Sequence, residues 1–205
     1  AERDAVPAML RLFEKEGFAA TWATVGFLFA GTREELERYS PKLKPAYQDP
    51  TLSPYDESIG DSESADPLHF ARQLVDQIKA TPRQEIGTHT YSHYYCLEPG
   101  QSRESFRADI QAARAIAADN GVELKSIVFP RNQVNLAYAD ILLEEGITSY
   151  RGNENSWIYK CHEKPGKYHP VQARLGRLAD TYLNLTGDNT IAWSQVLQPE
   201  GLCNI

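Results

Sequence analysis

The sequence lacks the features that mark several common protein classes. No run of apolar residues approaches the ~20 needed to cross a bilayer. Lys and Arg together number 21 against 28 Asp and Glu, so the formal net charge is −7. A nucleic-acid-binding surface normally has a basic excess, and a membrane-binding patch has a cluster of Lys and Arg. We therefore expect no nucleic-acid partner and no membrane-spanning segment in this chain.

Cysteine is scarce, and several catalytic motifs are absent. Cys96, Cys161 and Cys203 are far apart and odd in number, and no CxxC pair suggests a zinc knuckle. We expect buried or incidental thiols. No GxSxG elbow is present, which argues against an α/β-hydrolase-type enzyme. No phosphate-binding loop is present either, which argues against a nucleotide enzyme.

What remains is an ordinary globular composition with a regular alternation of elements. The 205 residues are 41% hydrophobic and 24% charged, which suits one domain with a sizeable core. Helical patterns are found at 5–16, 32–39, 67–80, 102–121, 135–145 and 172–185. Short apolar strands are expected at the start of 18–29 and at 84–88, 125–130 and 147–150. This alternation predicts an α/β fold with a parallel sheet or barrel.

One long polar stretch interrupts the alternation at residues 46–66. It is rich in Pro, Ser and acidic residues, and loops of this length in a compact domain are usually functional or disordered. Asp61, Glu63 and Asp66 suggest a calcium loop at first sight, but the central Gly and terminal Glu of an EF-hand are missing. A solvated loop is the expected structure.

The candidate site is the segment "EIGTHTYSHYY" at 85–95, which contains His89 and His93. The pair follows a predicted strand, and sites in parallel α/β folds gather at the carboxyl ends of strands. On a helical turn, residues four apart share one face, so two imidazoles can bind one ion such as Zn, Fe, Co or Ni. A metalloprotease would have Glu where Thr90 stands. By itself the spacing leaves two interpretations open: metal ligands, or structural and solvent-facing residues.

Several segments in order resemble the polysaccharide deacetylases, also called the NodB-homology or carbohydrate esterase family 4 group. "HTYSH" fits their H(S/T)xxH motif. The segments "VPAMLRLFEKEGFAATWATVGFLF", "SFRADIQAARAIAADNG", "SIVFPRNQVN" and "LLEEGITSYRG" are similar to the helices and strands around that motif. The resemblance covers about residues 5–151. It is closest to the branch found with bacterial surface-polysaccharide genes, which often carries "FPRNQ".

The resemblance implies a fold, a metal and a reaction. The fold would be a distorted (β/α) barrel with fewer than eight strands, incomplete at both termini, with residues 1–205 as a single partial domain. His89 and His93 would bind a divalent metal, zinc first and cobalt or nickel as alternatives, and Thr90 would support the turn. The reaction would be hydrolysis of acetyl groups on N-acetylated sugars, and the partner an acetylated carbohydrate.

Other family positions do not match, or match only in part. The Asp–Asp pair that supplies the base and third ligand, and the Leu-x-x-His that supplies the acid, are expected outside this chain. Asp4 stands alone, and His162 and His169 lie too early. Arg131 is transposed with Pro130 relative to the commoner motif, so it either orients a catalytic carboxylate or is solvent-exposed.

The remaining expectations concern the substrate and the setting. Tyr94 and Trp157 are predicted to contact the sugar, with core packing as the alternative, and residues 150–160 to form a rim loop. The alternative function is that of a non-catalytic barrel domain, which would act as a binding or scaffold part in polysaccharide assembly. The oligomeric state stays open. The compartment stays open between the bacterial cytoplasm and the cell envelope, with the cytoplasm favoured.

Overall fold

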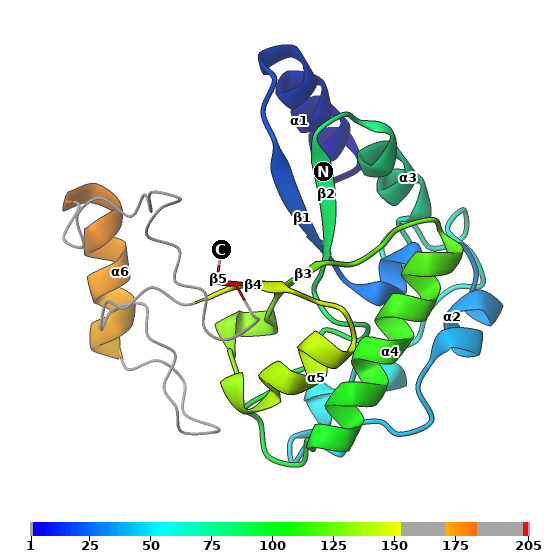
Figure 1. Ribbon diagram of the computed structural model, residues 1–205, viewed down its shortest axis with the longest axis vertical. Helices are drawn as coiled ribbons and strands as arrows, with labels where there is room; N and C mark the ends of the chain where they lie inside the picture. The colour runs from blue at the N-terminus through cyan, green and yellow to red at the C-terminus, as the bar shows by residue number, and fades with distance from the viewer. Residues whose placement is uncertain (1, 153–170, 184–202, 205) are drawn as a thin grey trace.

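A five-stranded parallel sheet organises the protein in a computed structural model, which describes residues 2–152, 171–183 and 203–204 (Figure 1). Its strands are β1 (Ala20–Thr24), β2 (Gln84–Thr88), β3 (Ser126–Val128), β4 (Ser149–Arg151) and β5 (Cys203–Asn204). They lie side by side in chain order, and every pairing is parallel. A doubly wound sheet reverses direction at a switch point, whereas a (β/α) barrel adds its strands in one direction. The predicted α/β architecture is therefore confirmed, and the strand order is of the barrel type.

Helices connect the strands at nearly the predicted places. The α-helices are α1 (Glu2–Glu16), α2 (Arg33–Tyr39), α3 (Arg72–Ala80), α4 (Arg103–Asp119), α5 (Ala139–Glu144) and α6 (Val171–Leu183). The 3₁₀ turns are η1 (Gly26–Phe29), η2 (Pro50–Leu52), η3 (Pro54–Asp56), η4 (Pro130–Asn132) and η5 (Leu136–Tyr138). The strongest helix prediction is confirmed in α4, where the Ser102 hydroxyl accepts a hydrogen bond from the Ser105 backbone N–H.

Two helix starts differ from the prediction for local reasons. The helix expected from residue 67 begins at Arg72, because the Asp66 carboxylate accepts hydrogen bonds from the backbone N–H groups of Leu68 and His69 at 3.3 Å. Such side-chain bonds offer the backbone an alternative to the helix. Asn135 caps the 3₁₀ turn η5, and the α-helix follows it.

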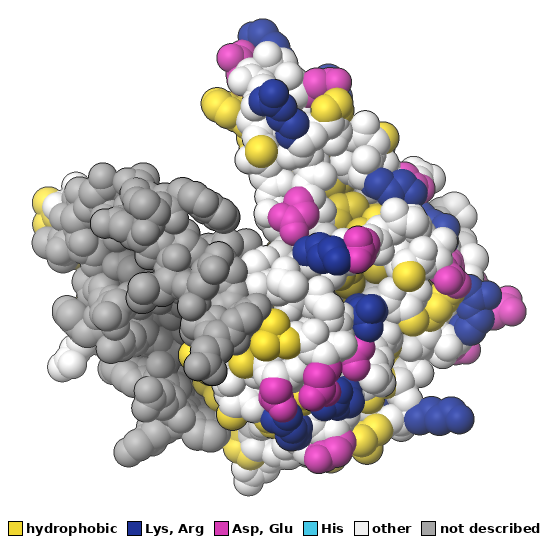
Figure 2. Space-filling view, in the orientation of Figure 1, with side chains coloured by type: hydrophobic (Ala, Val, Ile, Leu, Met, Phe, Trp, Pro, Cys, Tyr) yellow, Lys and Arg dark blue, Asp and Glu magenta, His cyan; other side chains and the backbone are white. Residues whose placement is uncertain are grey.

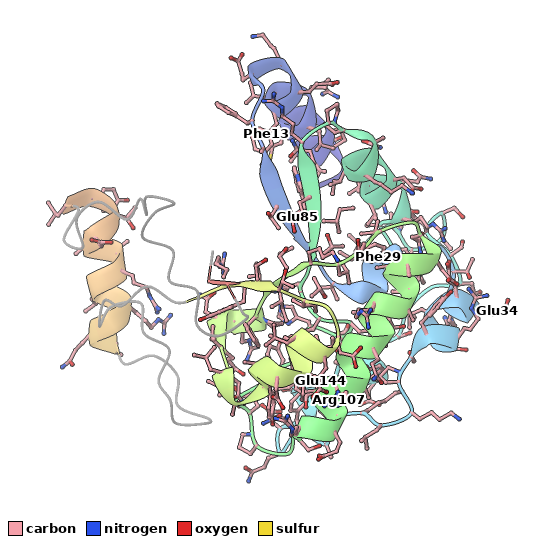
Figure 3. All side chains as sticks on the ribbon, in the orientation of Figure 1. Phe13, Phe29, Glu34, Glu85, Arg107 and Glu144 are labelled. Atoms are coloured by element: carbon pink, nitrogen blue, oxygen red, sulfur yellow. The ribbon has the colours of Figure 1, made fainter. Side chains whose placement is uncertain are left out.

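The core consists of two hydrophobic clusters that α4 joins. One cluster includes Phe29 and the inner faces of α1, α3 and α4, and the other packs α4 and α5 against β3 and β4. Ile116 of α4 belongs to the first and Phe106 to the second. On the outer surface, basic and acidic side chains stand next to one another over α4 and α5, as in the 2.5 Å pair of Arg107 with Glu144 (Figures 2 and 3).

Polar contacts hold the first three strands together. The Glu85 carboxylate on β2 accepts hydrogen bonds from the hydroxyls of Thr21 on β1, at 2.6 Å, and Ser126 on β3, at 2.8 Å (Figure 3). Gly87 allows this close approach, since a Cβ there would lie 2.5 Å from the Ser126 hydroxyl oxygen. The amino-terminal parts of these three strands are therefore held at a defined spacing.

The loop at 46–66 is structured and tied to the segment that follows the histidines. The backbone N–H groups of Ala46 and Gln48 donate to the carbonyls of Gly100 and Pro99, both at 2.9 Å. Two of its acidic residues form ion pairs, Glu63 with Arg3 and Asp61 with Arg33.

Along the described residues, no helix is both long and apolar enough to cross a membrane.

Candidate metal site

The two histidines lie at the carboxyl edge of the sheet. His89 directly follows β2, and its backbone N–H donates to the carbonyl of Thr24 at the end of β1, at 2.9 Å. Arg131 stands just beyond the end of β3, in η4. This is the edge where parallel α/β folds place their functional groups.

The segment that carries the histidines is a loop, so the expected helical turn is wrong. The backbone is left-handed at Thr90, with φ 65°, and at His93, with φ 58°. The two imidazoles still meet, with ring centroids 4.8 Å apart and an interplanar angle of 62°. The loop therefore places the two imidazole rings side by side, as the helical turn was expected to do.

Thr90 stabilises the loop with its side chain. Its hydroxyl donates to the carbonyl of His89 and accepts from the backbone N–H of Tyr94, both at 2.6 Å. Its own carbonyl accepts from the N–H of Gly26 at 2.9 Å. These bonds offset the cost of a left-handed backbone at a β-branched residue.

Hydrogen bonds also orient the rings. His89 Nδ1 lies 2.7 Å from the carbonyl oxygen of Val128. A carbonyl only accepts, so Nδ1 carries the hydrogen and the lone pair of the neutral ring is on Nε2. His93 Nδ1 lies 3.0 Å from the hydroxyl of Tyr95, which restrains the second ring. Partners of this kind are what metal-ligating histidines have behind them.

Burial favours the neutral form of both rings. It lowers the pKa of His93 to about 4, with further lowering from the neighbouring His89 and Arg131. Burial likewise lowers the pKa of His89, against the hydrogen bond from its ring to Val128. The pKa of His93 is therefore well below the usual value of about 6.5. Only neutral imidazole binds a metal, so this environment suits a ligand pair at neutral pH.

A buried carboxylate supports the middle of the loop. Asp109 on α4 has no exposed surface, and it accepts from the backbone N–H of Tyr91 at 2.6 Å and of Ser92 at 3.2 Å. Burial raises its pKa to about 6, although these bonds favour the ionised form. Asp109 was not predicted from the sequence as a residue of the site. The sequence feature that could have identified it is a charged residue on the apolar stripe of α4, next to Ile110. A carboxylate buried there is stable only if hydrogen bonds or a cation compensate its charge.

The other predicted site residues differ in their placement. The Arg131 guanidinium carbon lies 4.3 Å from the ring centroid of Tyr95, beside the His93 ring. Tyr94 is fully buried, and its hydroxyl lies 2.6 Å from that of Ser105. A ring without exposed surface offers no face to a sugar, so Tyr94 is wrong as a substrate contact in this conformation. Trp157 lies outside the described residues.

Comparison with known proteins assigns the family. The family model described as polysaccharide deacetylase matches residues 2–150, which is more than half of the chain. The chain belongs to the polysaccharide deacetylase family. No curated protein is found that matches the chain.

One solved structure of similar fold is that of IcaB from Ammonifex degensii. The likeness has 14% sequence identity and a TM-score of 0.46, and it covers 70% of the present chain. It covers 52% of the IcaB chain, so the present chain spans about half of that length.

Two imidazoles alone do not complete the metal site of a deacetylase. Among the residues that the structure describes, no group of three or more His, Cys, Asp or Glu side chains is placed to hold an ion. The free Nε2 of His89 and the neutral His93 ring fit two of the positions around a divalent cation. A third ligand beside the two imidazoles is not found among the described residues.

We expect the His93 ring of the metal-free protein to stay neutral down to about pH 4. In an unfolded chain the same ring gains its proton near ~6.5, so between these values the unfolded state binds more protons. This group therefore makes the folded state less stable as the pH falls through that window. Histidine ring C–H shifts in NMR, assigned with a His93→Asn variant, measure the midpoint. A His93 midpoint near ~6.5 in the folded protein would contradict the expected burial.

Proposed function

We propose that this protein removes acetyl groups from N-acetylated sugars of a polysaccharide or of its precursor, as a metal-dependent carbohydrate deacetylase. One observation carries the proposal: two neutral imidazoles meet at the carboxyl end of β2 in a chain of the polysaccharide deacetylase family. We propose His89 and His93 as metal ligands. Zinc is the expected metal because it suits imidazole and needs no redox chemistry, with cobalt or nickel as alternatives.

The residues of this chain would prepare the site in distinct ways. A divalent metal bound there would polarise the acetyl carbonyl and lower the pKa of a bound water towards ~7. The Val128 carbonyl sets the His89 tautomer, and the Tyr95 hydroxyl restrains the His93 ring. Arg131 places a positive charge over Tyr95, where it would favour the ionised form of a nearby carboxylate. Orientation of the catalytic carboxylate is the role that we propose for Arg131.

A second candidate function is a non-catalytic barrel that binds or scaffolds in polysaccharide assembly. This alternative is compatible with two imidazoles that have no third ligand among the described residues. A scaffold would bind acetylated carbohydrate without hydrolysing it. Acetate release therefore separates the two functions.

Acetate release from oligomers of N-acetylglucosamine tests the proposal directly. We expect the zinc-loaded protein at its full natural length to release acetate, and the activity to be lost with a chelator and in a His93→Asn variant. A His69→Ala variant is the matched control, because it removes a histidine whose ring pairs with the carboxylates of Asp66, at 2.7 Å, and Glu57, at 3.5 Å. Binding of the oligomer without acetate release would contradict catalysis and favour the scaffold.

A further inference from the structure

The buried carboxylate of Asp109 is the least usual polar group of the structure. Asp109 lies on the inner face of α4 with no exposed surface, between the buried Phe106 and Ile110. No basic side chain within the described residues forms an ion pair with it. A carboxylate is rarely fully buried without a cation, because it loses its hydration. Its charge is compensated by hydrogen-bond donors alone.

All of these donors come from the segment between the two histidines. One oxygen of Asp109 accepts from the Tyr91 backbone N–H at 2.6 Å. The other accepts from the Ser92 backbone N–H at 3.2 Å and from the Ser92 hydroxyl at 2.5 Å. The carboxylate therefore accepts hydrogen bonds from two consecutive residues at the centre of the HTYSH loop.

The residues bonded to Asp109 lie between the two strained positions of the loop. Thr90 and His93 have left-handed backbones, and Tyr91 and Ser92 separate them in the sequence. Strained conformations persist only where the surroundings hold them. Tyr91 is fully buried and Ser92 has 2% exposed surface, so their N–H groups would lack water as a substitute partner. Without the carboxylate, the two histidines would be joined by a loop free to take other conformations.

We propose that Asp109 is a positioning residue for the metal site, holding the Tyr91–Ser92 peptide so that the His89 and His93 rings converge. It acts from a separate helix, and its hydrogen bonds reach neither imidazole. The inference rests on the proposed function, in which the two histidines bind a metal. In this inference, α4 does more than pack against the sheet, because its residue Asp109 also affects the affinity for that metal.

The test is zinc binding by calorimetry and the visible spectrum of the cobalt-loaded protein, compared between the wild type and Asp109→Asn. Asparagine keeps the size of the side chain but turns one acceptor into a donor that faces the Ser92 N–H. Loss of a partner bonded directly to a metal ligand typically lowers metal affinity about 10- to 100-fold. Asp109 bonds to the loop and not to an imidazole, so we expect a loss at the lower end of that range, about 10-fold, with altered cobalt bands. A merely structural role would lower the melting temperature and leave the affinity of the folded protein unchanged.

Glu145→Gln is the matched control. Glu145 is also a buried carboxylate in contact with α4, bonded to Gln111 and Arg114 at 2.7 Å, but it has no bond to the histidine loop. We expect it to lose thermal stability and to keep the wild-type zinc affinity. Equal losses of affinity in the two variants would overturn the inference, because stability alone would then explain both.

Two further outcomes are distinguishable. If the wild type binds no zinc, the proposed metal site fails and the positioning role fails with it. If the wild type binds zinc and Asp109→Asn binds it equally well, the positioning role alone is wrong. If Asp109→Asn does not fold, Ser92→Ala removes the hydroxyl bond to the same carboxylate and leaves the two backbone N–H bonds in place. Its zinc affinity should then fall several-fold, and an unchanged affinity would overturn the inference.

Discussion

Replacing His93 by alanine is expected to weaken zinc binding by more than about a hundredfold. Removing an outer-shell partner already costs roughly 10- to 100-fold in metal affinity, and a direct ligand contributes more. His93 also has no substitute among the described residues, where no group of three or more potential ligands is placed to hold an ion. Calorimetric titration of the metal-free protein with zinc measures the change.

The left-handed backbone at His93 calls for a second variant. Alanine is unfavourable at φ 58°, so His93→Ala combines the loss of a ligand with a backbone effect. Asparagine tolerates this conformation better, and His93→Asn separates the two contributions. His69→Ala, which removes a histidine held by Asp66, should bind zinc as the wild type does. If His69→Ala lost as much affinity as the His93 variants, the assignment of the ligand pair would be wrong.

Replacing Gly26 by alanine is expected to lower the free energy of unfolding by about 1–3 kcal/mol, the usual cost of overpacking, and to weaken zinc binding as well. A Cβ at this position would lie 2.4 Å from Cδ2 of the Tyr91 ring and 2.7 Å from the Tyr91 Cα. Tyr91 has little freedom to move, because its hydroxyl donates to the Leu36 carbonyl at 2.6 Å and Asp109 holds its backbone. The added methyl group would therefore displace the histidine loop.

Gly31→Ala is the matched control for this substitution. A Cβ at Gly31 would have only ordinary contacts, at 3.7 Å to a Glu35 carboxylate oxygen and 3.8 Å to the Arg72 Cδ. Denaturant unfolding followed by circular dichroism, together with zinc titration, should show little change in this variant. Stability and zinc affinity of Gly26→Ala equal to those of Gly31→Ala would show that the loop is not packed against η1 as described.

Local patterns predicted the secondary structure well where one helix face or one strand decides it. The α4 helix has an N-cap at Ser102 and an apolar stripe, so its periodicity and capping agree with its burial. The start of α3 was predicted less well, because the hydrogen bonds of Asp66 to the following backbone compete with the helix there. The alternation of elements predicted a parallel sheet or barrel, and the structure decided the strand order within it.

The position of the two histidines after a strand was predictable from the sequence, but the geometry of the loop that carries them was not. The spacing of His89 and His93 indicated a pair, yet the expected helical turn is a loop. The loop conformation depends on contacts with Thr24, Gly26 and Asp109, which lie far from it in sequence. The burial of Tyr94 had the same origin, since the partners of its hydroxyl lie at the start of α4.

By itself, the sequence indicated the family through the resemblance of its motifs. It also determined the alternation of helices and strands and the position of two histidines at the end of a strand, because periodicity and residue type act over short distances. Only the tertiary structure decided how those imidazoles meet. Left-handed backbone at Thr90 and His93 is unfavourable in isolation, and it persists because α4, η1 and the end of β1 hold the segment between and beside them. The tautomer of His89 is set in the same way, by a carbonyl on the neighbouring strand β3.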